Sequence, residues 1–264
     1  MKIKNAIIIL GPGKSGSTLL NHMFSLHPDL YWISTYVNKF PGHPELTVFN
    51  NIYRLPKIEN LTREKSNFPR PAEAFYFWTR HIKTFWSDKP VSTEQAARLI
   101  KALDKIRKYQ SGNRLLIKLT GPTPPKLIES IFEDPHIIWL DRDPRATIAS
   151  YYANKWLYKN RPEVFASKSN LELIKEYTES YKKSELHKGK FRDFKFLEVS
   201  YEDLTEEPTA FLKKICEFTN LPYPSTFHSL IIDWDIKAGN NMKYQKLFTP
   251  AEITYMDKIL QEKI

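Results

Sequence analysis

The chain has 264 residues, of which 41% are hydrophobic and 27% charged, so it can bury a sizeable core and is not disordered by composition. Its one cysteine, Cys216, excludes an internal disulfide and is typical of a reducing compartment. The formal net charge of +10 is spread along the chain, which favours a site for an anionic ligand over nucleic-acid binding. No run approaches the roughly 20 apolar residues of a membrane span. The first apolar run is too short for a signal peptide, so we expect a cytoplasmic protein.

Short apolar segments predict buried parallel strands, and most of them precede a helical pattern. The predicted strands are Ala6–Leu10, Leu115–Leu119, His136–Leu140 and Phe194–Val199. The helices predicted after the first, third and fourth strands are Thr18–Leu26, Ala146–Tyr158 and Thr209–Phe218. This alternation predicts an α/β fold in which helices flank a central parallel β-sheet. We expect a single domain over residues 1–264.

The interval 28–113 departs from this pattern because it is rich in prolines and aromatic residues. Its clearest element is the predicted helix Thr93–Tyr109, for which Ser92 and Gln95 make a capping box. We interpret the interval as an insertion that builds the wall of an acceptor site within the same domain. Near the end of the chain, the segment Thr249-Pro-Ala-Glu252 predicts the start of a further helix.

A glycine-rich turn, Gly11-Pro-Gly-Lys-Ser-Gly-Ser-Thr18, joins the first predicted strand to the first predicted helix. Such a turn places backbone N–H groups and the positive end of a helix at one point, which is an anion site. The residues predicted to contact the anion are Gly13, Lys14, Ser15, Gly16, Ser17 and Thr18. A nucleoside-triphosphate P-loop needs a lysine directly after its last glycine. Ser17 follows Gly16, and Ile8 stands where the other register needs a glycine, so both registers fail.

Three later segments place polar or cationic residues beyond predicted strands. Arg142 follows the third strand, and Ser150 comes about two helical turns later, so both can face one anion at the carboxyl edge of the sheet. Tyr201 follows the fourth strand. Lys237 and Gly239 lie in a basic segment before the last predicted helix.

In their order along the chain, these four segments resemble those of the sulfotransferases that use 3′-phosphoadenosine 5′-phosphosulfate (PAPS). The chain resembles a bacterial-type member of this family, distinct from the cytosolic and tyrosylprotein branches. The resemblance implies a P-loop-like three-layer fold, in which the glycine-rich turn binds the 5′-phosphosulfate. It implies that Arg142 and Ser150 hold the 3′-phosphate and that Tyr201 lies near the nucleotide. The segment with Lys237 and Gly239 resembles an Arg-Lys-Gly segment that closes on the 3′-phosphate. Lysine in place of the arginine adds charge without a bidentate fork.

The resemblance also implies an enzyme of class EC 2.8.2.-, which moves a sulfuryl group from PAPS to a hydroxyl or amine by in-line displacement without a metal. Lys14 is placed to stabilise the leaving phosphate oxygen. Lys118, at the end of the second strand, resembles a lysine that many members place near the bridging oxygen. Thr120 occupies the position of the cytosolic enzymes' catalytic histidine. We therefore predict that Glu73, within the interval 28–113, is the general base.

Several alternatives stay open on the sequence alone. Glu73 can instead serve the positive end of a helix, and His43 or His81 can instead supply the base. A phosphotransferase would depend on ATP and Mg²⁺, and a non-catalytic binding module would show no turnover. The acceptor can be a carbohydrate, a lipid or another small molecule. The oligomeric state does not follow from the sequence.

Overall fold

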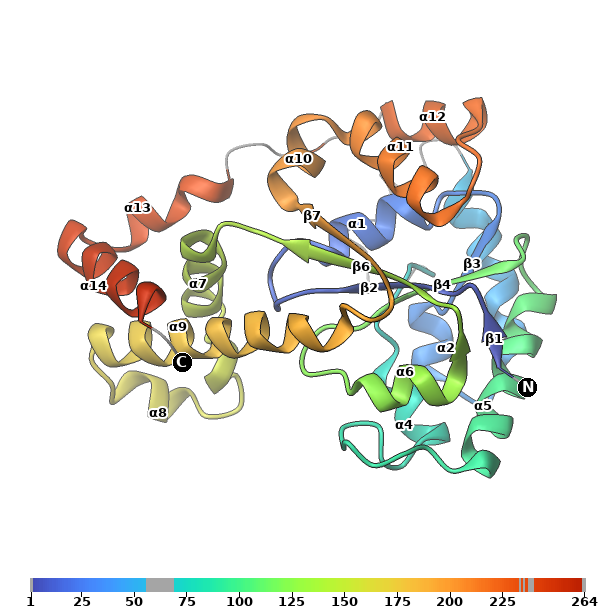
Figure 1. Ribbon diagram of the computed structural model, residues 1–264, viewed down its shortest axis with the longest axis horizontal. Helices are drawn as coiled ribbons and strands as arrows, with labels where there is room; N and C mark the ends of the chain where they lie inside the picture. The colour runs from blue at the N-terminus through green and yellow to red at the C-terminus, as the bar shows by residue number, and fades with distance from the viewer. Residues whose placement is uncertain (1, 56–68, 233, 235, 237–239, 263–264) are drawn as a thin grey trace.

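The computed structural model of the protein describes residues 2–55, 69–232, 234, 236 and 240–262. Its centre is a parallel five-stranded sheet with the strand order β3-β4-β2-β6-β7 (Figure 1). The strands are β2 (Ile7–Leu10), β3 (Leu30–Trp32), β4 (Arg114–Lys118), β6 (His136–Asp141) and β7 (Lys195–Ser200). A separate parallel pair joins β1 (Ile3–Lys4) to β5 (Phe132–Glu133). The central strand β2 is buried on both faces, as expected for a parallel sheet between helices.

Helices cover both faces of this sheet and complete a P-loop-like three-layer fold. One core joins the sheet to α1 (Ser17–Phe24), α11 (Pro208–Thr219) and α12 (Ser225–Ile232). The other joins it to α4 (Phe75–His81), α5 (Thr93–Lys108) and α6 (Pro125–Ile131). Because side chains alternate along a strand, Ile7 and Ile9 of β2 enter the first core, and Ile8 and Leu10 enter the second.

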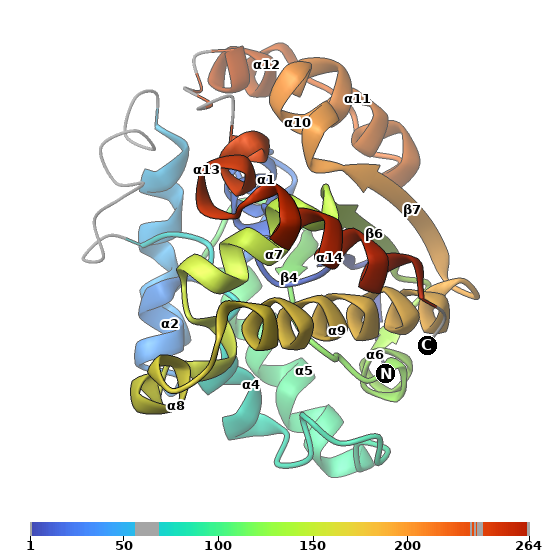
Figure 2. The same cartoon turned by 90° about the vertical axis from the view of Figure 1, so that its left-hand side faces the viewer.

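The remaining helices lie beside these layers and at the edge where the strands end (Figures 1 and 2). They are α2 (Thr35–Lys39), α7 (Pro144–Ala153), α8 (Pro162–Ala166), α9 (Asn170–Lys188), α10 (Tyr201–Glu206), α13 (Tyr244–Leu247) and α14 (Pro250–Gln261). The 3-10 helices are η1 (Pro44–Arg54), η2 (Trp156–Tyr158), η3 (Gly189–Phe191) and η4 (Asn240–Lys243). A third core packs α7, α9 and α14 together through Ile148, Ile174 and Met256. No helix in the described part of the chain is long and apolar enough to cross a membrane.

Part of the interval 28–113 belongs to the central sheet rather than to an insertion. β3 pairs with β4, with Tyr31 opposite Leu115. The sequence analysis overlooked β3 because it is only three residues long and does not show a period-two pattern. The helix α5 begins as predicted, since the Ser92 side chain accepts a hydrogen bond from the Gln95 N–H.

The helix predicted through Tyr158 ends at Ala153. Lys155 adopts a left-handed conformation with φ of 47°, and the short 3-10 helix η2 follows it. The long helix α9 was outside the predicted elements, because tyrosines such as Tyr177 and Tyr181 make up much of its buried face and weaken its apolar period. The helix start predicted at Thr249 is confirmed, and Thr249 and Glu252 form a complete capping box there.

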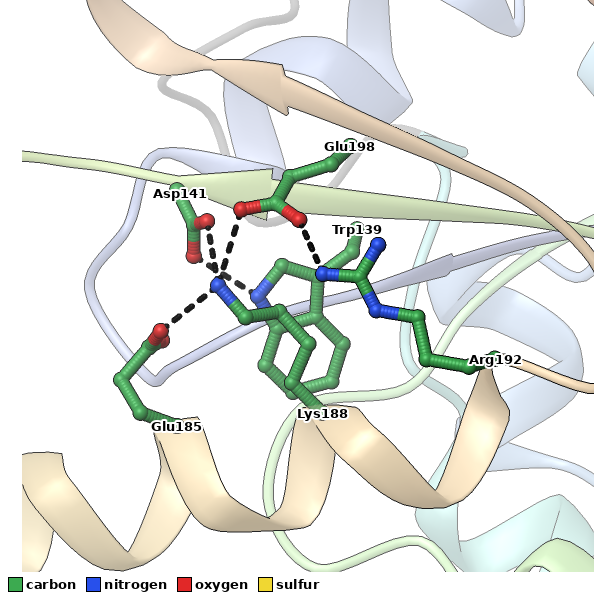
Figure 3. A network of polar contacts seen from close by, with 6 residues as sticks. All are labelled: Trp139, Asp141, Glu185, Lys188, Arg192 and Glu198. Atoms are coloured by element: carbon green, nitrogen blue, oxygen red, sulfur yellow. Dashed lines mark hydrogen bonds and ion pairs between the residues drawn. The ribbon is translucent and has the colours of Figure 1, made fainter.

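Lys188, at the end of α9, links this helix by ion pairs to Asp141 of β6 and Glu198 of β7 (Figure 3). Its Nζ lies 2.9 Å from Asp141, 2.7 Å from Glu185 and 2.9 Å from Glu198. Arg192 adds a second cation, which lies 2.6 Å from Glu198. Three carboxylates therefore face two cations, and one carboxylate lacks a full countercharge.

Of the two carboxyl groups Asp141 and Glu198, Asp141 is the one whose pKa is raised. Burial, and then the hydrogen bond to Glu198, raises the pKa of Asp141 to about 7. The same hydrogen bond lowers the pKa of Glu198 to about 2, with Lys188 adding to the effect. Asp141 therefore carries the proton of this pair, while Trp139 Nε1 donates a 2.7 Å hydrogen bond to it.

We expect Asp141→Asn to flatten the dependence of stability on pH. An unfolded aspartate has a pKa of about 3.9, so the folded state binds the extra proton between about pH 4 and about pH 7. The contribution of Asp141 to the free energy of unfolding therefore falls as pH rises through this window. In thermal unfolding from about pH 5 to about pH 8, the Tm of the wild type should therefore fall relative to that of Asp141→Asn as pH rises. The exposed Asp193→Asn is the matched control, and identical pH profiles for all three proteins would contradict the assignment.

Candidate functional site

The candidate site lies at the carboxyl edge of the sheet, and Figure 2 shows the molecule from this side. The strand order reverses at β2, because the chain adds β3 and β4 on one side of it and β6 and β7 on the other. Ligands of open parallel sheets bind outside such a switch point, where the loops of neighbouring strands diverge and leave a crevice. The glycine-rich loop 11–16 follows β2 and occupies this position.

The loop turns sharply into α1, and aromatic rings pack against its backbone. Gly16 precedes the helix with φ of 94°, a conformation that other residues rarely adopt, and a Cβ there would lie 2.2 Å from the ring of Tyr201. A Cβ on Gly13 would lie 2.9 Å from Trp156. Ser15 is fully buried, and its Oγ has no hydrogen-bond partner among the described residues. A buried hydroxyl without a partner beside a helix N-terminus suits an anionic ligand.

Lys14 is the cation of the loop, and other cations surround it. Its Nζ lies 3.3 Å from Oδ1 of Asn154 and 5.4 Å from the centroid of the Trp156 ring. Lys159 lies over the same ring at 4.8 Å. Burial, and then the charges of Lys159 and Lys118, lowers the pKa of Lys14. An anion bound at the loop would reverse this effect, because it favours the charged form of the amine.

Arg142 joins the loop to the segments that follow β6 and β7. Its guanidinium lies 4.5 Å from the centroid of the Tyr201 ring and donates to the carbonyl oxygen of Lys14 at 3.1 Å. It also donates to Oδ1 of Asn241 at 2.9 Å, and Asn241 donates to Glu202 at 2.7 Å. Burial lowers the pKa of Arg142, although an arginine stays charged at neutral pH. These contacts hold the guanidinium beside the loop.

A pocket of about 630 Å³ opens next to Arg142. Its lining combines three cations, Arg142, Lys243 and Lys246, with the polar residues Ser150 and Asn154. Small alanines on the same face of α7 leave the space for a ligand. The sequence analysis missed Asn154, although it follows Ser150 by one helical turn and therefore shares its face. It also missed Lys243 and Lys246, for which no sequence signal indicated proximity to α7.

Lys118 and Glu73 meet at the end of β4. Lys118 Nζ lies 3.2 Å from Glu73 Oε1 and donates to Thr18 Oγ1 at 2.8 Å. Thr120 donates a hydrogen bond to the same carboxylate oxygen. The side chains of Lys118 and Glu73 are 8% and 25% exposed, so the carboxylate keeps access to solvent. Burial lowers the pKa of Lys118, and the charge of Glu73 opposes that shift.

The local backbone directs Glu73 toward β4 rather than along a helix. Ala74 precedes α4 in a left-handed conformation with φ of 57°, so Glu73 lies outside the first turn of the helix. The Ala72 N–H donates to the Ile33 carbonyl at 3.0 Å, and Trp78 Nε1 donates to the Glu73 carbonyl at 2.8 Å. These bonds fix both ends of the turn. The structure therefore does not support the alternative, in which Glu73 stabilises the positive end of a helix.

The structure thus places two groups of predicted site residues at one edge of the sheet. Lys14, Lys118 and Glu73 are close enough for their charges to affect one another, and Arg142 and Ser150 line a single pocket. The predicted residues Lys237 and Gly239 lie outside the described residues. Of the alternative bases, His43 is exposed and pairs with Glu45 at 2.7 Å, whereas His81 ends α4. Within the described ranges, no group of three or more His, Cys, Asp or Glu side chains is placed so that it could hold a metal ion.

Comparisons with known proteins bear on the fold and on the family of the chain. No curated protein sequence matches the chain. The structure superposes on sulfotransferase STF9 from Mycobacterium avium with a TM-score of 0.63 at 12% identity, over 98% of this chain and 77% of the other. It superposes on the sulfotransferase domain from the curacin biosynthetic pathway with a TM-score of 0.57 at 15% identity, over the whole of both chains. For mouse sulfotransferase SULT7A1 complexed with PAP, the TM-score is 0.51 at 14% identity, over 97% and 82% of the two chains.

These likenesses show a shared fold, and a family model extends the match to the sequence. The model described as the sulfotransferase family matches residues 6–225. The matched range contains the loop after β2, the base candidate Glu73, the strand-end Lys118 and both Arg142 and Ser150. The chain therefore belongs to the sulfotransferase family.

Proposed function

We propose that the protein transfers a sulfuryl group from PAPS to a hydroxyl or amine of an acceptor by in-line displacement. The observation that carries the proposal is the cluster of Lys14, Lys118 and Glu73 at the ends of β2 and β4, beside a pocket lined by cations. The mouse relative of the same fold is complexed with PAP, which supports PAPS as the donor.

The residues present fit a donor with two anionic ends. We infer that the 5′-phosphosulfate lies on the N-terminus of α1, where Lys14 supplies a charge and Ser15 a hydroxyl without a partner among the described residues. The pocket with Arg142 and Ser150 would then hold the 3′-phosphate. The ring of Tyr201 contacts the backbone of the loop and stacks on Arg142, so it would fix the distance between the two anion sites.

The reaction breaks the bond between sulfur and the bridging oxygen of the donor, and it forms a bond between sulfur and the acceptor oxygen. Negative charge accumulates on the leaving phosphate oxygen during this step. Lys118 donates a hydrogen bond toward that oxygen, and Lys14 adds a second positive charge. Both amines act in a half-buried site, where a fixed charge stabilises the transition state more than it would in water.

Glu73 takes the proton that the acceptor hydroxyl loses. Its Oε1 is held by Lys118 and by the hydroxyl of Thr120. Its Oε2 makes no hydrogen bond within the described residues and is left to accept the proton as the new O–S bond forms. Thr120, which replaces the histidine of the cytosolic branch, would therefore orient the base rather than act as the base.

Calorimetric titration with PAP and with ATP tests the donor assignment. The wild type should bind PAP without Mg²⁺ and more tightly than ATP. Arg142→Lys should weaken PAP binding by roughly 10- to 100-fold, because lysine lacks the planar fork that stacks on Tyr201 and grips a phosphate. Arg107→Lys on α5 is the matched control and should keep wild-type affinity.

Tighter, Mg²⁺-dependent binding of ATP would instead indicate a phosphotransferase and overturn the proposal. Turnover is measured separately with labelled PAPS and a panel of hydroxyl and amine acceptors. PAP binding without turnover on any member of a broad panel would favour a binding module over an enzyme.

A further inference from the structure

A second groove runs across α2, α4 and α5, away from the predicted donor pocket. It consists of two pockets of about 590 and about 280 Å³, whose linings share Pro41 and Arg80. Tyr76, which is 73% exposed, stands on its wall. The groove and the donor pocket beside α7 have no lining residue in common within the described part of the chain.

The lining of this groove is strongly basic. Its cations are Lys39, Arg80, Arg98, Lys101 and Lys105, and we call the depression that they line the basic groove. No carboxylate from the described residues lines it.

The carboxylates around the basic groove leave most of its charge unbalanced. Among the described residues only Arg98 of its cations has an ion-pair partner, Glu94, at 3.3 Å. Glu45 acts on Lys105 at longer range but already pairs with His43. Like charges that line one depression repel one another and attract an anion, because their potentials add.

His81 adds a polar group to the smaller pocket. Its Nε2 is buried and has no hydrogen-bond partner among the described residues. Burial, and then the charges of Arg80 and Arg98, lowers the pKa of His81, so the imidazole is neutral at pH 7. A neutral imidazole can donate its N–H to an oxyanion in the pocket.

The basic groove lies on the helix that follows the predicted base. Glu73 lies two residues before the first residue of α4, whereas Tyr76, Thr79 and Arg80 on that helix line the groove. At about 1.5 Å per residue, Arg80 lies about 7.5 Å along α4 from its first residue, Phe75. PAPS does not account for these cations, because its predicted contacts lie in the loop after β2 and beside α7.

We propose that the basic groove binds an anionic group, a phosphate or a sulfate, of the acceptor itself, at a distance from the hydroxyl that Glu73 activates. The inference rests on the proposed function for the position of the reacting hydroxyl. It narrows the acceptor from any alcohol to one that carries an oxyanion at a distance from the reacting group. The donor and the acceptor anion then occupy separate cationic sites.

The test compares two triple variants that lose the same charge. Arg80→Ala/Lys101→Ala/Lys105→Ala removes exposed cations of the basic groove. Lys126→Ala/Lys175→Ala/Lys214→Ala removes exposed cations of α6, α9 and α11 and is the control. Calorimetry measures the binding of tripolyphosphate, and in a second arm of a sulfated tetrasaccharide, with saturating PAP in the donor site. The arm that binds more tightly distinguishes a phosphate from a sulfate.

We expect the groove variant to bind the preferred probe at least about tenfold more weakly than the wild type, and the control variant to change little. An equal loss in both variants would show non-specific attraction to a basic protein and overturn the inference. Absence of binding of either probe to the wild type would also overturn it. The affinity for PAP is measured in parallel. If the wild type does not bind PAP, the proposed function fails. The comparison of the triple variants without PAP then still decides whether the groove binds the anionic probe.

Discussion

Glu73→Gln is expected to lower kcat by about 10²- to 10⁴-fold while PAP binds as it does to the wild type. Glutamine keeps the shape of the side chain and can still accept hydrogen bonds from Lys118 and Thr120, but it cannot take up a proton. The loss should therefore fall on the chemical step. Single-turnover measurements with labelled PAPS and an acceptor found by screening separate this step from substrate binding.

Two further variants make this result specific. Glu129→Gln, an exposed residue of α6, is the matched control and should keep wild-type turnover. Thr120→Val removes the hydrogen bond to Glu73 but leaves the base, so its effect on kcat should be smaller, and Thr120→Ser should restore most of the activity. Near-normal turnover of Glu73→Gln would remove Glu73 from the role of general base.

Lys14→Ala should lower kcat by about 10²- to 10³-fold, which is the usual cost of removing one donor aimed at charge that develops in the transition state. The amine lies on a loop held by Tyr201 and Trp156, so its loss should leave the fold intact. The measurement is the rate of sulfuryl transfer at saturating PAPS, with thermal unfolding as a check on folding.

Lys159→Ala is the matched control for this change, because Lys159 also lies over the Trp156 ring but does not belong to the loop. It should keep most of the turnover. The charge of Lys159 lowers the pKa of Lys14, so this variant should also shift the loss of activity at alkaline pH toward higher pH. Equal losses in Lys14→Ala and Lys159→Ala would indicate a general electrostatic effect and contradict a specific role for Lys14.

The residues proposed for the donor half of the site could be named from the sequence because each of its parts is local. A strand, a glycine-rich turn and a helix place Lys14 and Gly16 without any distant contact. Arg142 and Ser150 are related by helical spacing alone, and the structure places both on one pocket. Local patterns also predicted the four longest strands of the central sheet and the helix start at Thr249.

Other parts of the site, in both the donor half and the acceptor half, depended on contacts between distant segments. The sequence suggested Glu73 as a base, but its contact with Lys118 exists only because the turn before α4 lies against the end of β4. Likewise, Lys243 and Lys246 reach the pocket of Arg142 only because the last helices fold back over α7. A break at Lys155, which no spacing predicted, turns Trp156 onto the loop.

By itself the sequence determined the parallel α/β fold, the family and the position of the glycine-rich loop between β2 and α1, since strand burial and helix spacing act over a few residues at a time. Only the tertiary structure decided that β3 completes the sheet, that Glu73 faces Lys118 and that the cations of α2, α4 and α5 share one groove. Those relations depend on how segments far apart in the chain pack, and residue spacing carries little information about such packing.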